Sequence, residues 1–85
     1  MKITIIIPFY NEVVRINLEN FHQIFTAFPN YNFLLVDDGS SDKTIDVLEE
    51  FKSEFSTIEV LKLNKNIGKA EAIRSAVLSI SDADF

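Results

Sequence analysis

The chain has 85 residues, of which 47% are hydrophobic, a formal net charge of −5 and no cysteine. This length allows one small domain, whose free energy of unfolding we expect to be on the order of 5 kcal/mol. The negative charge argues against a nucleic-acid binder but allows a nucleotide ligand, because a metal ion and backbone N–H groups can offset phosphate charge. The lack of cysteine excludes disulfides and thiolate metal sites, and we expect the reducing cytoplasm as the location. The apolar run at the start is too short for a signal peptide or a membrane span.

The first predicted strand is Ile3 to Ile7, an apolar and largely β-branched run that is typical of a strand buried on both faces. Pro8 is expected to end this strand. An amphipathic helix follows, with Asn11 and Glu12 as candidate caps of its first turn. Its apolar stripe has steps of four and three residues and consists of Val14, Leu18, Phe21, Phe25 and Phe28.

The second strand is predicted at 32–36, and Ser40 or Ser41 is expected to cap the next helix. The apolar stripe of that helix is Ile45, Leu48, Phe51 and Phe55. A third strand is predicted at 57–63 and a third helix at 69–80. On that last helix we expect small alanines for close packing and one apolar side formed by Ile73, Val77 and Ile80.

The order β-α-β-α-β-α predicts an α/β fold with parallel strands and right-handed crossovers. We expect the sheet order 3-2-1, as in one half of a doubly wound, Rossmann-like domain. The strand at 3–7 would then have a neighbour on one side only. Residues 1–85 therefore read as half a domain, truncated before a fourth strand. Because an open edge is a template for strand pairing, we expect self-association through this strand.

Ligands in such folds bind beyond the carboxyl ends of the strands, and three unusual segments are expected there: 8–12, 37–41 and 64–69. In the first segment a proline turns the chain out of the sheet, and polar residues follow it. The simpler interpretation of this segment is a strand end followed by a helix cap.

The second segment contains the adjacent acids Asp37 and Asp38, which are costly at a strand end unless donors or cations face them. Asp37 is a candidate acceptor for a ribose hydroxyl or a base N–H. Asp38 is a candidate neighbour of a metal-bound diphosphate. The alternative is an ordinary Asp-Gly turn in which an aspartate caps the helix, and Gly39 suits either interpretation because it tolerates positive φ.

The third segment places Gly68 and Lys69 at the start of a helix and resembles a weak phosphate cradle. The helix start offers free N–H groups and the positive end of the helix dipole, and the lysine adds a charge. It is not a Walker A motif, because that motif's earlier glycine and its Ser/Thr after the lysine are missing. The alternative is a loop whose lysine serves solubility.

Three stretches in this order, I-I-I-P-F-Y-N-E, L-L-V-D-D-G-S-S-D-K-T and N-I-G-K-A-E-A-I-R-S-A, resemble the N-terminal, nucleotide-binding half of a family 2 glycosyltransferase with the GT-A fold. The dolichyl-phosphate mannose and glucose synthases are the branch that the chain resembles most. The resemblance implies a transferase that moves a sugar from a nucleotide diphosphate sugar to an acceptor such as a lipid phosphate or a polysaccharide. It also implies work at the cell envelope, on the cytoplasmic side of the membrane, with any membrane segments outside this chain.

The resemblance implies nucleotide-binding roles at eight positions. Asp37 would contact the base or ribose, Asp38 would lie beside the diphosphate, and the glycine-lysine pair would lie near the base and phosphates. The complete set is Pro8, Tyr10, Asn11, Glu12, Asp37, Asp38, Gly68 and Lys69. The resemblance further implies Mg²⁺ or Mn²⁺, held by a D-x-D motif, which offsets charge on the leaving diphosphate.

The tripeptide Asp82-Ala83-Asp84 matches D-x-D, but we interpret it differently. It follows a predicted helix rather than a strand, and Asp82 is only 14 residues past Gly68, which is shorter than the family's interval. We expect 82–85 to be a turn that enters a fourth strand. The metal motif, the acceptor site and the catalytic base would then lie beyond Phe85, so this part of the protein would carry the nucleotide-binding loops and would not turn over alone.

Two other classes remain as alternatives. Receiver domains of two-component signalling also contain paired acids after an apolar strand, where the acids bind Mg²⁺. Receivers, however, place the pair after the first strand, whereas here a full βα unit precedes it. The other alternative is a non-catalytic interaction module with no ligand, which nucleotide binding would exclude.

Overall fold

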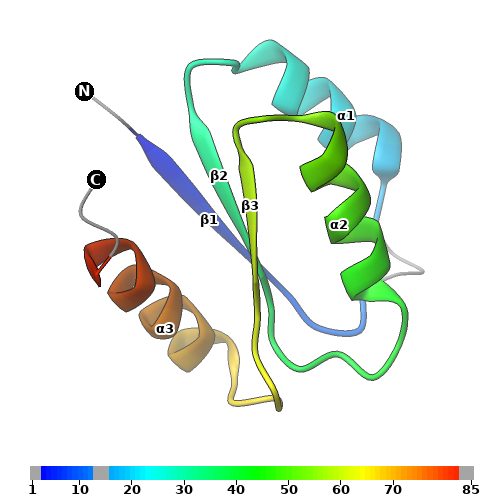
Figure 1. Ribbon diagram of the computed structural model, residues 1–85. Helices are drawn as coiled ribbons and strands as arrows, with labels where there is room; N and C mark the ends of the chain where they lie inside the picture. Colours follow the sequence, from blue (N-terminus) through cyan, green and yellow to red (C-terminus); the bar gives the residue numbers. More distant parts are fainter. Residues whose placement is uncertain (1–2, 13–15, 83–85) are drawn as a thin grey trace.

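The computed structural model describes residues 3–12 and 16–82, which form three strands and three helices (Figure 1). In chain order the elements are β1 (Thr4–Phe9), α1 (Leu18–Ala27), β2 (Asn32–Asp37), α2 (Thr44–Glu54), β3 (Ile58–Lys62) and α3 (Lys69–Asp82). The strands are parallel, and their order across the sheet is β1-β2-β3. The predicted α/β fold and the predicted order 3-2-1 are confirmed.

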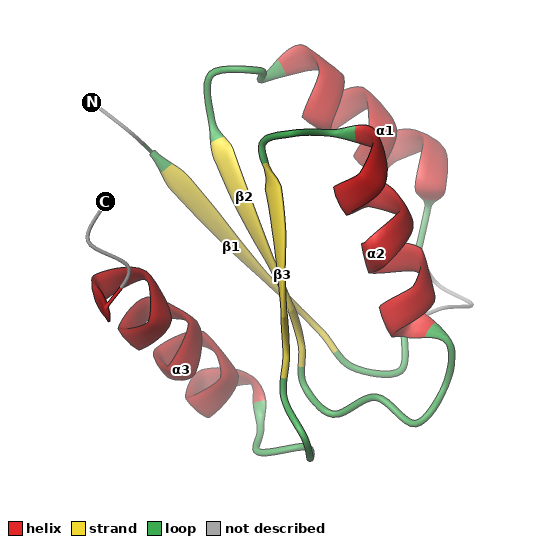
Figure 2. Cartoon of the chain, viewed as in Figure 1, coloured by secondary structure: helices red, strands yellow, loops and turns green. Residues whose placement is uncertain are grey.

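The sheet lies between two helical layers, with α1 and α2 on one face and α3 on the other (Figure 2). The middle strand β2 is buried on both faces, because successive side chains of a strand point to opposite sides. Phe33 and Leu35 pack in the core under α1 and α2. Leu34 and Val36 pack against α3. This two-sided burial explains why the sequence of β2 is a continuous apolar run.

Phenylalanine rings form the centre of the core between the sheet and the helices α1 and α2. Phe25 is only 1% exposed, and its ring centroid lies 4.9 Å from that of Phe33 and 5.1 Å from that of Phe51, both in edge-to-face geometry. Of the predicted stripe, Phe21 also packs against this core, whereas Leu18 and Phe28 are exposed. Val14 lies outside the described residues.

Pro8 was predicted to end the first strand, and this prediction is wrong. Pro8 lies inside β1 and pairs with Val36. The carbonyl groups of Ile3 and Phe9 accept hydrogen bonds from the N–H groups of Asn32 and Asp38, at 2.9 Å and 2.8 Å. Because hydrogen-bonding groups alternate along a strand, the odd-numbered residues of β1 bond to β2 and the even-numbered ones point away from it. The N–H that proline lacks would therefore lie on the open edge, where no ladder bond is lost.

The predicted helix caps are also wrong. Asn17 caps α1, and its Oδ1 accepts a hydrogen bond of 3.0 Å from the N–H of Asn20. Lys43 occupies the cap position of α2, and Asp42 supplies the carboxylate that accepts from the N–H of Thr44 at 2.9 Å. The earlier polar residues, Asn11 and Glu12 before α1 and Ser40 and Ser41 before α2, belong to the loops between strand and helix.

Helix α3 packs on the sheet through alanines. Ala72 and Ala76 are fully buried against β2, whereas Ile73 and Ile80 are half-buried and Val77 is 47% exposed. The expectation that Ile73, Val77 and Ile80 form the packed side is therefore only partly met. The small alanine side chains let the helix axis approach the sheet, and the larger residues lie at the flanks of the contact.

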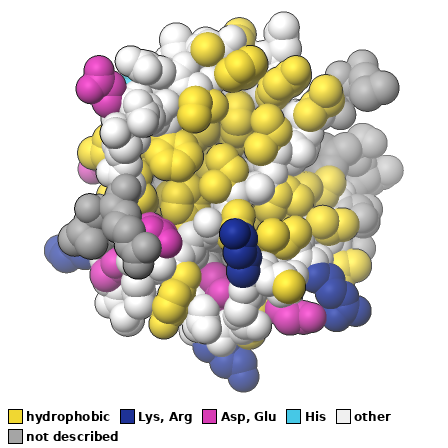
Figure 3. All heavy atoms as spheres, turned by 180° about the vertical axis from the view of Figure 1, so that it is seen from behind, with side chains coloured by type: hydrophobic (Ala, Val, Ile, Leu, Met, Phe, Trp, Pro, Cys, Tyr) yellow, Lys and Arg dark blue, Asp and Glu magenta, His cyan; other side chains and the backbone are white. Residues whose placement is uncertain are grey.

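Strand β1 is an edge strand of the described sheet. In the view from behind, hydrophobic side chains form a broad surface, with most charged side chains toward its lower part and margins (Figure 3). The exposed large hydrophobic residues of the chain include Ile3, Leu18, Val77 and Leu78. Among the described residues, no helix has the length and hydropathy that crossing a membrane requires.

Candidate functional site

The loops that follow the three strands meet at the carboxyl edge of the sheet, where ligands of open α/β folds bind. They enclose a cavity of about 240 Å³. Five of the eight predicted site residues line this cavity, together with two that were not predicted. The lining residues are Pro8, Phe9, Tyr10, Glu12, Asp38, Asn66 and Lys69.

The first loop is tied to the second by hydrogen bonds in both directions. The backbone N–H of Asn11 donates to Oγ of Ser40 at 3.0 Å, and the N–H of Ser41 donates to Oδ1 of Asn11 at 2.8 Å. The N–H of Glu12 donates to Oγ1 of the buried Thr44 at 3.0 Å. Asn11 has φ of 49°, a left-handed conformation that asparagine tolerates better than most residues. Asn11 therefore shapes the loop and does not line the cavity.

Asp37 ends β2 and is completely buried. Its Oδ1 accepts a hydrogen bond of 3.2 Å from the N–H of Ser40, while its Oδ2 has no hydrogen-bond partner among the described residues. A buried carboxylate oxygen without a donor is unfavourable, so Oδ2 of Asp37 is a candidate acceptor for a donor from outside the described residues. Asp37 lies beneath the loops rather than on the cavity wall.

Asp38, in contrast, uses both carboxylate oxygens within the protein. Its Oδ2 accepts hydrogen bonds from Nδ2 of Asn66 at 2.9 Å and from the N–H of Gly68 at 3.1 Å, and its Oδ1 accepts one from the N–H of Ile67 at 2.9 Å. A receiver-type magnesium site needs both acids of the pair turned toward the same ion. Here Asp37 is buried and Asp38 is engaged by the third loop, which speaks against that alternative.

Glycine is required at position 39 for two reasons. Gly39 has φ of 69°, and a Cβ atom there would lie 2.2 Å from the carbonyl carbon of Lys65 and 2.3 Å from the nitrogen of Asn66. The second and third loops thus pass each other backbone against backbone. Gly68 has φ of 94°, but a Cβ atom there would meet nothing within 4 Å, so only its conformation demands glycine.

Lys69 is the first residue of α3 and lines the cavity. The first turn of a helix has N–H groups without partners inside the helix and carries the positive end of the helix dipole. The ammonium group and the helix start are therefore next to each other at the cavity, an arrangement suited to an anion such as phosphate. Gly68 directly precedes them, and its carbonyl accepts from the N–H of Ala72 at 2.9 Å.

Sequence reasoning missed four residues of this region. Phe9 was missed because Pro8 was expected to end the strand, and Asn66 because only the glycine and lysine of its segment were singled out. Ser40 and Thr44 hold the first loop through hydrogen bonds that span 29 and 32 residues of sequence. A polar residue two positions before a glycine is a signal for Asn66, whereas nothing in the local pattern indicates the long-range partners of Ser40 and Thr44.

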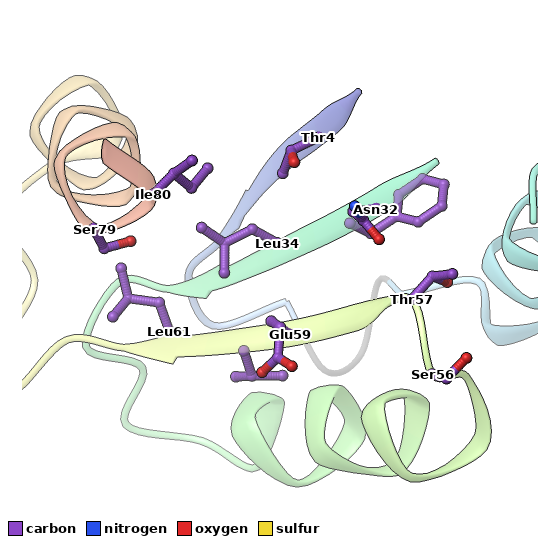
Figure 4. A pocket seen from close by; sticks show the side chains of 11 residues that line it. Thr4, Asn32, Leu34, Ser56, Thr57, Glu59, Leu61, Ser79 and Ile80 are labelled. Atoms are coloured by element: carbon purple, nitrogen blue, oxygen red, sulfur yellow. The ribbon is translucent and has the colours of Figure 1, made fainter. Parts of the chain in front are cut away.

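A larger cavity, of about 430 Å³, lies at the opposite end of the sheet (Figure 4). Leu34 and Leu61 of the sheet and Ile80 of α3 form apolar walls, and Thr4, Asn32 and Thr57 mark the amino ends of the strands. None of the predicted site residues lines it. We place the functional site in the smaller cavity, because polar groups from three loops converge there at the carboxyl ends of the strands.

The D-A-D tripeptide contributes no described metal site. Asp82 is the last residue of α3, so it does not begin the turn that was predicted for 82–85, and Ala83, Asp84 and Phe85 lie outside the described residues. Within residues 3–12 and 16–82, no group of three or more metal-binding side chains comes together. The described residues therefore do not form a complete site for Mg²⁺ or Mn²⁺.

Curated proteins similar to this chain are glycosyltransferases. A dolichol-phosphate mannosyltransferase of Pyrococcus furiosus is 38% identical over 76 residues, which cover 86% of this chain and 21% of that protein. A dolichyl-phosphate beta-glucosyltransferase of Saccharomyces cerevisiae is 32% identical over 87 residues, covering 92% and 26%. A poly(ribitol-phosphate) beta-glucosyltransferase of Bacillus spizizenii is 28% identical over 87 residues, covering 100% and 14%. The chain thus spans about a quarter or less of the length of these relatives.

The sequence profile of the family described as "Glycosyl transferase family 2" matches residues 4–84. The parallel sheet with helices on both faces agrees with the Rossmann-like GT-A fold that the resemblance implies. Because the match covers nearly all of the sequence, the chain belongs to glycosyl transferase family 2.

Proposed function

We propose that this chain is the nucleotide-binding part of a glycosyltransferase that transfers a sugar from a nucleotide diphosphate sugar to an acceptor. The observation that carries the proposal is the cavity at the carboxyl edge of the sheet. There the aromatic ring of Tyr10, the ammonium group of Lys69 and the start of α3 surround one space, with the unpaired carboxylate oxygen of Asp37 beneath the same loops. Such a site has a group suited to each part of a nucleotide diphosphate.

Each part of the nucleotide has a proposed partner. Asp37 accepts a hydrogen bond from a base N–H or a ribose hydroxyl, which supplies the donor that its Oδ2 lacks. Because this oxygen is buried beneath the loops, the contact requires the loops to shift when the nucleotide binds. Tyr10, which is exposed at the cavity wall, is placed to contact the base or sugar. Lys69 and the N–H groups of the first turn of α3 bind the diphosphate.

The acceptor and the location that we propose rest on the family. The printed names of the relatives include transferases that act with dolichol phosphate and with poly(ribitol phosphate). We therefore propose a phosphate-linked lipid or polymer as the acceptor class and the cytoplasmic side of the cell envelope as the place of action. A divalent metal is expected for the whole enzyme, and because the described residues form no complete metal site, we propose that this part alone does not turn over.

The test is a titration of the chain with UDP, GDP and dTDP, each with and without Mn²⁺. Saturable binding of one nucleotide, lost in Asp37→Asn, would support the proposal, and the preferred base would identify the donor class. Binding of none of the three would overturn the proposed site. A gain in affinity with Mn²⁺ would contradict the proposal that this part of the protein does not work with a metal on its own.

We also propose that a second copy of the chain pairs with the open edge of β1. No charged side chain is present between Ile3 and Pro8, so the net charge of −5 does not oppose contact at this edge. The N–H and C=O groups of Thr4 and Ile6 point away from β2. In an antiparallel pair, Thr4 of one copy lies opposite Ile6 of the other, and all four residues can hydrogen bond without an N–H from Pro8.

Sedimentation over a broad concentration series tests this pairing. Thr4→Pro removes one outward N–H at the first residue of the strand and leaves the bonds between β1 and β2 in place. We expect a concentration-dependent dimer in the wild type and a much weaker one in Thr4→Pro. Phe28→Lys, which removes an exposed apolar residue remote from the strand edge, is the control. A wild-type monomer at every concentration, or equal association of Thr4→Pro, would exclude the edge as the interface.

A further inference from the structure

Asp38 connects the second loop to the third. All the hydrogen bonds that its carboxylate accepts come from the third loop. Its carboxylate accepts from Nδ2 of Asn66, from the N–H of Ile67 and from the N–H of Gly68, at distances between 2.9 Å and 3.1 Å. Nδ2 of Asn66 also lies 3.3 Å from the carbonyl oxygen of Asp38. The three donors belong to consecutive residues, and they are separated from Asp38 by 28 to 30 positions in the sequence.

The segment that Asp38 holds leads directly into the candidate phosphate-binding group. Gly68 is followed by Lys69, which begins α3 and lines the cavity. The carboxylate therefore fixes the position from which the helix starts, and with it the direction of the first N–H groups. The close approach of Gly39 to the backbone of Lys65 and Asn66 is an independent sign that the two loops are packed against each other here.

These contacts leave Asp38 little capacity for a ligand. A carboxylate has about four lone-pair positions, of which three are used by the third loop. The residue is 2% exposed.

We propose that Asp38 is a positioning residue, which acts on the nucleotide through the third loop and does not bind the sugar nucleotide or its metal. It holds Asn66, Ile67 and Gly68 so that Lys69 and the start of α3 face the diphosphate. This assignment rests on the proposed function of the cavity. It goes beyond the resemblance, which places Asp38 beside the diphosphate, because it states the atoms through which the aspartate works.

The test compares diphosphates with the matching nucleosides: UDP, GDP and dTDP against uridine, guanosine and thymidine. In Asp38→Asn an amide nitrogen replaces one carboxylate oxygen and faces donors on the third loop. We expect affinity for the preferred diphosphate to fall about tenfold or more, as for the loss of charge-assisted hydrogen bonds, while affinity for the nucleoside stays nearly unchanged. A general loss of folded structure would lower both affinities together.

A second readout is amide hydrogen exchange at Ile67 and Gly68, which should become faster in Asp38→Asn. Glu59→Gln is the charge-matched control, because Glu59 is an exposed acid of β3 that pairs with Lys52 at 3.7 Å and does not line the cavity. It should leave both the preference for the diphosphate and the exchange rates near the wild-type values. The double variant Asp38→Asn/Asn66→Asp exchanges donor and acceptor and should recover part of the lost preference.

The outcomes separate this inference from the proposed function. Loss of diphosphate binding with unchanged exchange at Ile67 and Gly68 would mean that Asp38 touches the ligand directly, and the inference would be wrong. Faster exchange with an unchanged preference would show that the loop does not position the diphosphate, which also overturns it. If the wild type binds no nucleotide, the proposed function fails together with the binding role of Asp38, and the exchange rates still report whether Asp38 orders the loop. If Asp38→Asn does not fold, Asn66→Ala removes only the amide contacts of one side chain with Asp38 and leaves the two backbone N–H donors in place. It should shift both readouts in the same direction.

Discussion

The side-chain oxygen of Asn11 accepts a hydrogen bond of 2.8 Å from the backbone N–H of Ser41, which is 30 residues further along the chain. The backbone N–H of Asn11 in turn donates to Oγ of Ser40. One asparagine thus joins the loop after β1 to the loop after β2, and it does so with φ of 49°. This position depends on two properties of asparagine: a side-chain oxygen that accepts a hydrogen bond, and tolerance of the left-handed backbone conformation.

Substitutions at Asn11 separate these two properties. Asn11→Asp keeps an acceptor and should change the free energy of unfolding little. Asn11→Gly keeps the conformation but removes the acceptor, at a cost of about 1 kcal/mol. Asn11→Ala loses both and should cost about 2 kcal/mol, because left-handed backbone is unfavourable for alanine. Urea unfolding measures the series, and equal values for glycine and alanine would contradict the role given to the backbone conformation.

The two glycines of the chain should respond differently to alanine. Gly39→Ala combines a left-handed backbone with a clash against the backbone of the third loop, and we expect a loss of at least about 3 kcal/mol. Gly68→Ala meets open space and should lose only about 1–2 kcal/mol for its conformation. The midpoint of urea unfolding decides the comparison. Similar losses for both would show that the loops can separate at Gly39 without cost.

Asp37→Asn should abolish nucleotide binding without destabilising the free protein. The amide oxygen can still accept from the N–H of Ser40, and a buried carboxylate oxygen without a partner is removed. Because an uncharged amide is less costly to bury, the free energy of unfolding should stay equal or rise. Urea unfolding and nucleotide titration of the same sample check this. A large loss of stability would mean that Asp37 is a structural residue.

Phe25 on α1 and Phe28 directly after it form a pair that compares a buried phenylalanine with an exposed one. Phe25 is 1% exposed and contacts four other phenylalanine rings, so Phe25→Leu should cost about 1–2 kcal/mol. Phe28 is 47% exposed and stacks only on Tyr31 among the described ring pairs, so Phe28→Leu should cost less than about 1 kcal/mol. Thermal and urea unfolding give the two values. A larger effect at Phe28 would contradict the assignment of the core.

The sequence allowed the element order, the parallel sheet and its strand order to be predicted, because continuous apolar runs and helical stripes depend on local spacing. Pro8 was placed wrongly, since a proline is excluded from paired positions but not from the outward-facing positions of an edge strand. The helix caps were wrong for a related reason. Asn11 and Ser40 bond to each other's loops instead of to the nearest helix, and such distant partners leave no mark in the local pattern.

The position of the candidate site was predictable from the sequence, but the hydrogen bonds between its residues were not. The rule that ligands bind at the carboxyl ends of strands located the three segments, and five of the eight predicted residues line the cavity. The contacts that distinguish the two aspartates were not predictable, because the partners of Asp38 lie 28 to 30 residues further along the chain and leave no mark in the local pattern. Asp37 falls on the side of α1 and α2, and Asp38 reaches across to the third loop. Direct contacts of these residues with a nucleotide remain predictions.

The hydrogen bonds between the loops have a thermodynamic consequence for the whole chain. The three loops follow three different strands and are joined by contacts that span about 30 residues each, so the cavity exists only when the complete sheet has formed. A bound nucleotide is therefore linked to global unfolding and not to the opening of one loop. At a ligand concentration 100 times the dissociation constant, the stability of the folded state should rise by about 2.7 kcal/mol, a large fraction of what a domain of this size has.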